Sequence, residues 1–545
     1  MSTSMATITD LYRPLDEADV GRKHWLTVFT AGMGFFTDAY DLFIIGTVTV
    51  LLTPIFHLST NQISLLNSIS LLASVAGALT FGRLMDKLGR KRMYGVEVAI
   101  LVLGAVLCAF AWNFTSLFIF RLIVGYGVGG DYATSAVITS EYSTRKSRGR
   151  LVGSVFAMQG LGLLAGPAIA SIFLGAGVSN GLAWRLMLGL GAVPAASVIY
   201  LRRKIRETPR YTMTVQGDAT ATAQTVAWMT GQEPASRSNG TGHGAEAVSG
   251  PTVAPGPTVA PTPAATGAPT PAATVVPVFT AAVAPTPAAP TASAARRKLT
   301  SRPFLLRLIG TAGSWFLLDI AFYGNSVSSP LILKLLQPKG TLLDHTLISL
   351  AIFAVAALPG YWLAVFLMDR IGRRRIQWQG FAVMAAAFAL IWLVPDGATA
   401  VGVFLPLFAI SYFFTEFGPN VTTFVFPSEI FPTSVRGTAD GISAACGKFG
   451  AFLGALFVPH LLKAVGISGV MGVMAAVSVV GIALTLVALP EPMGQTLEEA
   501  AGEIEPESKP GPDSGSDSSD PRSLEPRSSV PRSSEPEPIV ASAIA

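Results

Sequence analysis

The sequence predicts an all-α membrane protein with twelve transmembrane helices in two pseudosymmetric six-helix bundles. Apolar runs of bilayer-spanning length recur along the 545 residues. Only 13% of the residues are charged, against about 25% in soluble proteins. Short motifs also occur once in each half, which is typical of two bundles related by pseudosymmetry.

The two bundles are expected at residues 25–202 and 303–490. The expected spans of the first are 25–52, 63–84, 93–112, 115–140, 150–176 and 183–201. Those of the second are 304–329, 346–368, 376–394, 401–426, 438–462 and 466–489.

Three polar segments lie outside the spans. Residues 1–24 do not resemble a signal peptide. The linker 203–302 is rich in Pro, Ala, Thr and Gly, and the tail 491–545 repeats Glu-Pro-Arg-Ser-Ser-like units. Such compositions bury too little apolar surface to fold, so both segments are expected to be largely disordered.

Basic residues set the expected orientation. They follow the second, fourth, sixth and eighth spans, whereas loops 53–62 and 395–400 carry almost none. The positive-inside rule therefore puts both termini and the linker in the cytoplasm. The expected location is the plasma (inner) membrane, with the lipid bilayer as partner; because the basic residues cluster in short loops, a nucleic-acid partner is not expected.

Two motifs repeat at equivalent places. Asp86-Lys-Leu-Gly-Arg-Lys-Arg92 matches the run from Asp369 to Arg375, and Ser140-Glu141 with Arg148-Gly149 matches Ser428-Glu429 with Arg436-Gly437. Acidic residues at helix ends pair with arginines and cap helix termini. The matched copies favour a cytoplasmic gate over a mere positive-inside anchor. The candidate gate residues are Asp86, Arg90, Glu141, Arg148, Asp369, Arg373, Glu429 and Arg436.

The fourth span contains Gly125-Tyr-Gly-Val-Gly-Gly-Asp-Tyr132. An ionisable residue such as Asp131 is costly at that depth unless it faces a partner or a water-filled cavity. The glycines allow close approach of a helix or a ligand. A glycine-rich packing face with one salt-bridged Asp is the alternative.

The run Gly82 to Lys91, its second copy and the six-plus-six division resemble the major facilitator superfamily. Arg206-Glu-Thr-Pro-Arg210 and the run Pro490 to Glu499 resemble its sugar-porter-like branch. The second copy departs from the pattern at Val365, where the first has a glycine.

Four stretches together resemble the phosphate:proton symporter family. They are Gly34 to Phe43, Gly129 to Tyr132 with Ser140-Glu141, Trp315 to Tyr323, and Phe417 to Phe424. The resemblance implies a secondary active transporter that imports inorganic phosphate with protons by alternating access. It implies a substrate site at Tyr132, Gln159, Trp315, Asp319, Tyr323, Asn420 and Lys448.

The residue types suit an oxyanion. Trp315, Asp319 and Tyr323 are four residues apart and share one helix face. Lys448 lies in an otherwise apolar span, where an ammonium needs an anion. The alternatives are aromatic residues of the core, a Gln159 that only bonds a neighbouring helix, and a Lys448–Asp319 salt bridge without a ligand.

Proton coupling needs buried carboxyl groups that gain and lose a proton near the working pH. The resemblance implies a proton route through Asp38 and Asp131, and Asp41 lies three residues after Asp38. Glu97 and Arg121 are expected to tune Asp131. We further hypothesise that Asp319 is protonated when phosphate is bound.

Two local departures from the family pattern bear on the site. Ala133-Thr134 stands where the family has Pro-Leu, which puts a helix kink in doubt. Glu416 stands where eukaryotic members tend to have Asn. It adds a titratable group beside the site or only bonds a neighbour, and the second reading is favoured.

Other functions are less well supported. An organic-anion or sugar porter, and a phosphate-sensing receptor with little transport, are the alternatives. No Gly-x-x-x-x-Gly-Lys-Ser/Thr run for ATP is present, and the two cysteines, Cys108 and Cys446, indicate no metal site. We expect no enzyme activity, no cofactor and no obligatory oligomer.

Overall fold

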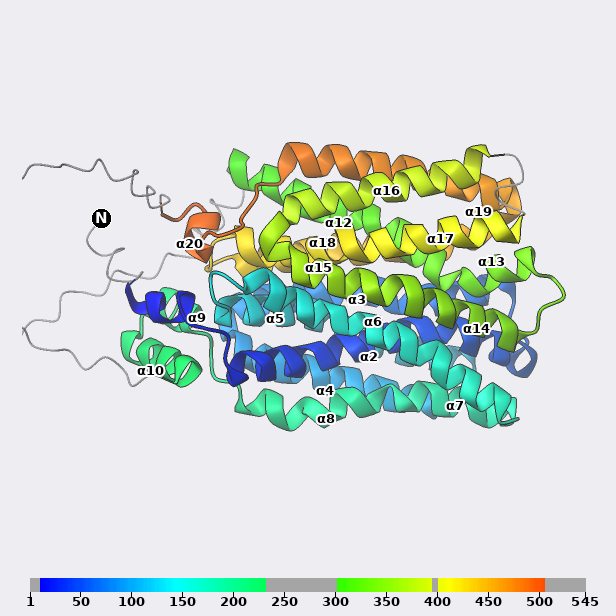
Figure 1. The fold of residues 1–545 in the computed structure, drawn as a ribbon. Helices are drawn as coiled ribbons and strands as arrows, with labels where there is room; N and C mark the ends of the chain where they lie inside the picture. The colour runs from blue at the N-terminus through cyan, green and yellow to red at the C-terminus, as the bar shows by residue number, and fades with distance from the viewer. Residues whose placement is uncertain (1–9, 232–300, 395–399, 505–545) are drawn as a thin grey trace, which may run out of the picture. The chain divides into compact units, whose positions relative to one another are not determined.

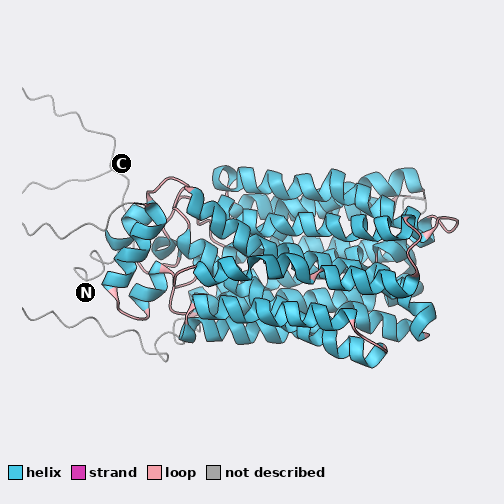
Figure 2. Ribbon diagram, turned by 90° about the horizontal axis from the view of Figure 1, so that it is seen from below, coloured by secondary structure: helices cyan, strands magenta, loops and turns pink. Residues whose placement is uncertain are grey.

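The computed structural model describes residues 10–231, 301–394 and 400–504, and these residues form helices without strands (Figure 2). Ten of its helices are long and apolar enough to cross a membrane. Two further spans complete the set. Helix α5 (Phe114–Tyr142) has 29 residues, enough to cross a membrane, but carries three charged residues. Helix α19 (Arg436–Ala488) contains two spans that meet at Gly466 (φ 68°, ψ −177°). The predicted fold class is confirmed.

The first half contains α2 to α8 (Figure 1). Its spans are α2 (Arg22–Phe56), α3 (Thr60–Leu88), α4 (Arg90–Ala109), α5, α6 (Arg148–Gly175), and the pair α7 (Asn180–Leu190) and α8 (Ala192–Lys204). The second half begins at α12 (Arg302–Val327). Its other elements are α13 (Ser329–Leu336), α14 (Leu342–Ile352), η1 (Phe353–Ala357), α15 (Leu358–Ile371), α16 (Arg373–Leu393), α17 (Val401–Thr415), η2 (Glu416–Asn420), α18 (Val421–Ile430) and α19.

The repeated motifs form two equivalent tight turns. Gly89 and Gly372 have φ of 98° and 99°, a conformation that favours glycine, and each separates two helices by a single residue. The carboxylate of Glu207 accepts hydrogen bonds from the backbone N–H groups of Arg90 and Lys91, and Glu491 does the same for Arg373 and Arg374. Each carboxylate thus caps a helix N-terminus.

Two spans of the second half are interrupted by π-helical turns, which the sequence analysis did not predict. They are η1 and η2. In η2, Gly418 has non-helical backbone angles (φ −101°, ψ −112°) and Pro419 follows it. The backbone of Gly418 lies so close to that of Gly380 in α16 that neither glycine leaves room for a side chain. Such turns frequently occur at functional sites.

The two halves meet through matched helix pairs. Helix α3 packs against α19, and α6 packs against α14 and α15. Aromatic residues of both halves join at the centre, where Phe35 of α2 lies 4.7 Å from Tyr132 and 4.9 Å from Phe424 between ring centroids.

Short helices gather at one end of the bundle (Figure 1). They are α9 (Pro209–Thr214), α10 (Ala219–Thr230) and α20 (Leu497–Ala500). We call this end, which contains Asp86, Glu141, Asp369 and Glu429, the motif end. Residues 203–231 and 491–504, which belong to the two segments expected to be largely disordered, are described in the structure, and salt bridges and caps hold them in place. The rest of the linker and tail, 232–300 and 505–545, lies outside the described residues.

Candidate functional site

Five of the seven predicted substrate-site residues form one buried cluster between the halves. Lys448 Nζ lies 3.0 Å from the Tyr323 hydroxyl and 3.4 Å from an Asp319 carboxylate oxygen. It also lies over the Tyr132 ring, 3.9 Å from the centroid. The Trp315 ring lies 6.1 Å from the Tyr132 ring. The predicted helix face of Trp315, Asp319 and Tyr323 thus converges on the ammonium.

Local packing explains the position of Trp315. A Cβ at Gly447 of α19 would overlap the indole, so the glycine lets Trp315 lie directly against the helix that carries Lys448. The indole, two phenols and an ammonium then lie in one small region. An oxyanion accepts hydrogen bonds from all of these groups.

The other two predicted residues lie at the edge of this cluster. Asn420 donates to the Tyr361 hydroxyl at 2.8 Å and to the carboxylate of Glu416. Gln159 is buried, and its side-chain oxygen has no hydrogen-bond partner among the described residues. Three residues earlier on α6, Phe156 packs against the rings of Tyr132 and Tyr361. The Gln159 amide therefore has a free hydrogen-bonding atom among the described residues, whereas the Asn420 amide must reorient to meet a ligand.

A second charged cluster adjoins the first through the chain itself, because Asp131 precedes Tyr132. Arg202 Nη2 lies 3.0 Å from Asp131, and its Nη1 lies 2.9 Å from Glu97. Both oxygens of the buried Asp38 lack hydrogen-bond partners among the described residues. A Cβ at Gly34 would overlap the Asp131 carboxylate and Arg202, so this glycine makes room for the ion pair.

Arg121 pairs with Asp41 and not with Asp131, the residue that it was expected to tune. Its Nη1 lies 2.6 Å from Asp41 and makes no hydrogen bond to Asp131. The cation beside Asp131 is Arg202, which the sequence analysis assigned to a loop because it opens the basic run after the sixth span. In the structure α8 continues to Lys204, and the Arg202 guanidinium is buried 4.1 Å from the Tyr94 ring centroid. The available signal was that the sequence analysis had one cation, Arg121, for two acids within the spans, Glu97 and Asp131.

The candidate gate residues cluster at the motif end and connect the halves reciprocally. Asp86 accepts from the backbone N–H groups of Gly437 and Thr438, at 3.1 and 2.7 Å. Asp369 accepts from those of Gly149 and Arg150, at 3.0 and 2.8 Å. Each carboxylate therefore caps the first turn of a helix in the opposite half.

The arginines of the gate are less symmetric. Glu141 pairs with Arg90 at 3.1 Å and with Arg436 of the other half at 2.9 Å. Glu429 pairs with Arg373 of its own half at 2.9 Å. The fourth arginine, Arg148, lies 3.8 Å from Asp16 and donates to the backbone oxygen of Gln495. The motif end is closed by these contacts.

Segments outside the spans complete this closure. Arg210 pairs with Asp16 at 2.8 Å and with Glu498 at 2.9 Å, joining the N-terminal segment, the linker and the tail. Burial raises the pKa of the Asp16 carboxyl, an effect that Arg210 opposes. Burial also acts to raise the pKa of Glu498, but Arg210 overcomes it and holds that pKa below its usual value.

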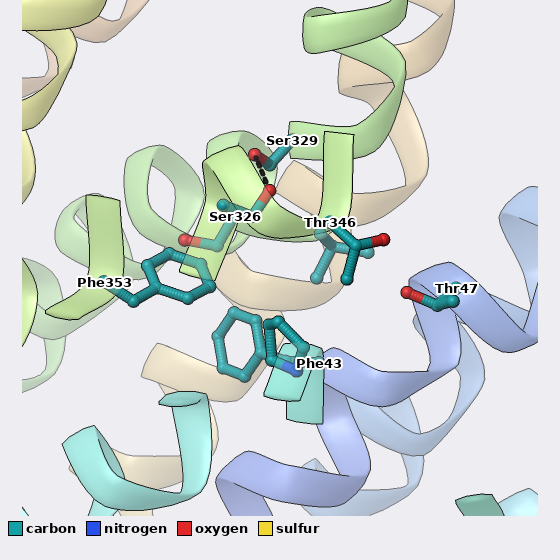
Figure 3. Close-up of a pocket in the computed structure, with 9 residues that line it drawn as sticks. Phe43, Thr47, Ser326, Ser329, Thr346 and Phe353 are labelled. Carbon is teal, nitrogen blue, oxygen red and sulfur yellow. Dashed lines mark hydrogen bonds between the residues drawn. The ribbon is translucent and has the colours of Figure 1, made fainter. Parts of the chain in front are cut away.

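A small cavity lies toward the opposite end, on the far side of Phe43 from the substrate cluster. Its volume is about 30 Å³, enough for a water molecule. Its lining includes the hydroxyls of Thr47, Ser326, Ser329 and Thr346 (Figure 3). The Phe43 ring stacks on Tyr323 at 5.7 Å and separates the cavity from Lys448.

Comparison with known proteins identifies the family. The model of the Major Facilitator Superfamily matches residues 25–439 and, in a second placement, 315–534. The chain belongs to the major facilitator superfamily. Members of this superfamily are transporters, and the chain is a multi-pass membrane protein and not an enzyme.

Similar proteins of this superfamily match over nearly the whole chain. "Low affinity inorganic phosphate transporter 8" of Medicago truncatula is 34% identical, over 92% of this chain and 94% of its own. "Probable inorganic phosphate transporter 1-6" of Arabidopsis thaliana is 33% identical, over 91% and 97%. Among solved structures, the proton:xylose symporter XylE matches with a TM-score of 0.68 at 18% identity, over 88% of this chain and 98% of that one. This structural match supports the fold.

Proposed function

We propose that this protein is a secondary active transporter that imports inorganic phosphate together with protons by alternating access. The observation that carries the proposal is the buried ammonium of Lys448 among hydroxyl and indole donors between the two halves. A buried cation with such neighbours suits a compact oxyanion better than a neutral sugar. Relatives named inorganic phosphate transporters, matched over nearly their full length, support the substrate.

When phosphate binds, Lys448 exchanges its contact with Asp319 for a hydrogen bond to the anion. Phosphate accepts hydrogen bonds from Lys448, Tyr132 and Tyr323, while Trp315, Asn420 and Gln159 supply the remaining donors. An ionised Asp319 repels the anion, so protonation of Asp319 favours phosphate binding. Proton and substrate binding are thereby linked.

Protons reach the site through the cluster that adjoins it. Asp131 and Tyr132 are consecutive residues, one in each cluster. Asp38, whose two carboxylate oxygens have no hydrogen-bond partner in the described part of the chain, is the group best placed to accept a proton. The neighbouring acids Asp41 and Glu97 stay ionised because they pair with Arg121 and Arg202.

The motif end is one of the two ends through which the site opens in turn. We assign it to the cytoplasmic side of the plasma membrane because its loops carry the basic residues. In the structure this side is closed. Rocking the halves apart breaks the bonds from Asp86 and Asp369 to the opposite half. The cavity beyond Phe43 marks the outer side, and movement of Phe43 opens the site to it.

Uptake of labelled phosphate into proteoliposomes, with and without an inward proton gradient, tests the proposal. We expect gradient-driven accumulation by the wild type and its loss in Asp319→Asn. We expect Lys448→Ala to weaken phosphate binding by about a hundredfold, since truncating one partner of a buried charge pair is costly. Lys463→Ala, an exposed lysine of the same helix, is the matched control and should behave as the wild type.

The other outcomes are equally informative. Accumulation that does not depend on the gradient contradicts the proton coupling and leaves the phosphate site standing. Gradient-driven accumulation that is retained in Asp319→Asn contradicts the role of Asp319 in that coupling. Absence of phosphate uptake by the wild type contradicts the substrate and favours an organic anion or a sugar.

A further inference from the structure

Glu416 is a buried acid at the edge of the substrate cluster with no role in the mechanism above. It opens the π-helical turn η2, four residues before Asn420, and is fully buried. One carboxylate oxygen accepts from the Asn420 amide. The other, Oε1, has no hydrogen-bond partner among the described residues. A Cβ at Gly360 of α15 would lie only 3.1 Å from the Glu416 Cβ, so this side chain is tightly confined on its other side.

None of the ion pairs among the described residues involves Glu416. The cation of the site, Lys448, is occupied by Asp319 and Tyr323. The titratable groups that face Glu416 come from three elements and are phenols or acids. They are Tyr361 of α15, Tyr412 of α17 and Asp319 of α12. A buried carboxylate without a cation is costly, and it relieves the cost by taking up a proton.

The net charge of the site also favours protonation of Glu416. With both carboxyls ionised, Asp319 and Glu416 contribute two negative charges and Lys448 one positive charge, a net charge of −1 before phosphate arrives. Phosphate adds at least one more negative charge. Because Lys448 stabilises Asp319 as the carboxylate, Glu416 is the easier of the two acids to protonate.

We infer that Glu416 carries a coupled proton: its carboxylate takes up a proton when phosphate binds and returns it when phosphate leaves. This inference rests on the proposed phosphate–proton symport and adds one proton to each transport cycle. The proton comes from the side on which phosphate enters and resides on Oε1, while Oε2 keeps its hydrogen bond from Asn420. On phosphate release the O–H bond breaks and the proton leaves on the opposite side of the membrane. The neutral carboxyl also offers an O–H donor to the site.

The proton-to-phosphate ratio of full-length protein in proteoliposomes tests the inference. The ratio is obtained from the membrane potential at which net flux of labelled phosphate is zero, at several proton gradients. We expect Glu416→Gln to transport phosphate with a ratio one proton lower than the wild type. Glu416→Asp, which keeps a carboxyl, should retain the wild-type ratio. Tyr361→Phe is the matched control, since it removes a hydroxyl from the same cluster without removing a carboxyl group, so its ratio should equal that of the wild type.

Proton uptake on phosphate binding to the detergent-solubilised protein, followed with a pH-indicator dye, is the second measurement. Glu416→Gln is expected to take up one proton fewer than the wild type. An unchanged ratio and unchanged uptake in Glu416→Gln overturn the inference, and so does a one-proton loss in Tyr361→Phe. If Glu416→Gln does not fold, a lost proton in Glu416→Asp overturns it instead. A wild type that moves phosphate without protons overturns the proposed function, which is a different result.

Discussion

At the scale of single residues, one arginine decides the charge balance of the buried acids Glu97 and Asp131. Arg202 lies between Glu97 and Asp131 and balances one of their two charges. Its neighbour in sequence, Arg203, is exposed. Residue type and position in a basic run do not distinguish the two. Only the direction of each side chain, inward onto Tyr94 or outward to the surface, does so.

We therefore expect Arg202→Gln to abolish gradient-driven uptake and to destabilise the protein by about 3–5 kcal/mol, because two buried carboxylates lose their cation. Arg203→Gln should change the unfolding free energy by less than about 0.5 kcal/mol and leave uptake intact. Thermal unfolding in detergent and uptake in proteoliposomes measure both. Equal behaviour of the two variants would show that the ion pair with Asp131 is dispensable.

At the scale of elements, closure depends on helix N-termini. The first turns of α6 and α19 each present two backbone N–H groups to a carboxylate of the opposite half. These are hydrogen bonds to a charged acceptor at the positive end of a helix, which favours the anion. The same Asp residues also lie beside Arg90 and Arg373, so capping and charge pairing act on the same carboxylates.

The double substitution Asp86→Asn and Asp369→Asn is expected to open the motif end. Each lost bond to a charged group is worth about 2 kcal/mol, so the ratio of closed to open molecules falls at least tenfold. Spin labels at Lys87 and Arg370, in a background without the native cysteines, report this opening as a longer distance between the labels by double electron–electron resonance.

A cap within one half provides the control for this experiment. Asp344 accepts from the backbone N–H of Thr341 at the N-terminus of α14, near the opposite end. Asp344→Asn should leave the distance between the labels unchanged. A double variant that also leaves it unchanged would mean that the caps do not hold the halves together.

At the scale of the whole molecule, three segments far apart in the sequence close the motif end together. Asp16, Arg210 and Glu498 belong to the N-terminal segment, the linker and the tail, and they form a single ion-pair chain. Arg148 of the gate approaches the same Asp16. Any movement that separates the two halves at the motif end is therefore expected to disturb these segments as well.

This ion-pair chain makes stability depend on pH. The pKa of Glu498 is lowered in the folded protein, so its contribution is present above the unfolded-state value and is lost as pH falls through the folded-state value. We expect Glu498→Gln to cost about 2 kcal/mol near neutral pH. The difference from the wild type should shrink below about pH 4.

Thermal unfolding of both proteins across this pH range checks the sign. Glu17→Gln, which breaks an exposed pair with Arg13, is the control and should cost about 0.5 kcal/mol or less at any pH. A Glu498→Gln penalty that grows toward acid would contradict the assignment.

The sequence by itself determined the fold class, the spans, the repeated motifs and the helix face that meets Lys448. These follow from local properties: apolar length, motif spacing, and the four-residue period that puts Trp315, Asp319 and Tyr323 on one helix face. The tertiary structure alone decided the partners. Arg121 meets Asp41, and Arg202 meets Asp131. It also decided that residues 203–231 and 491–504 are ordered, since their stability comes from ion pairs and caps with distant segments. Ion pairs between helices depend on how those helices rotate and pack, and no local pattern in the chain encodes that rotation.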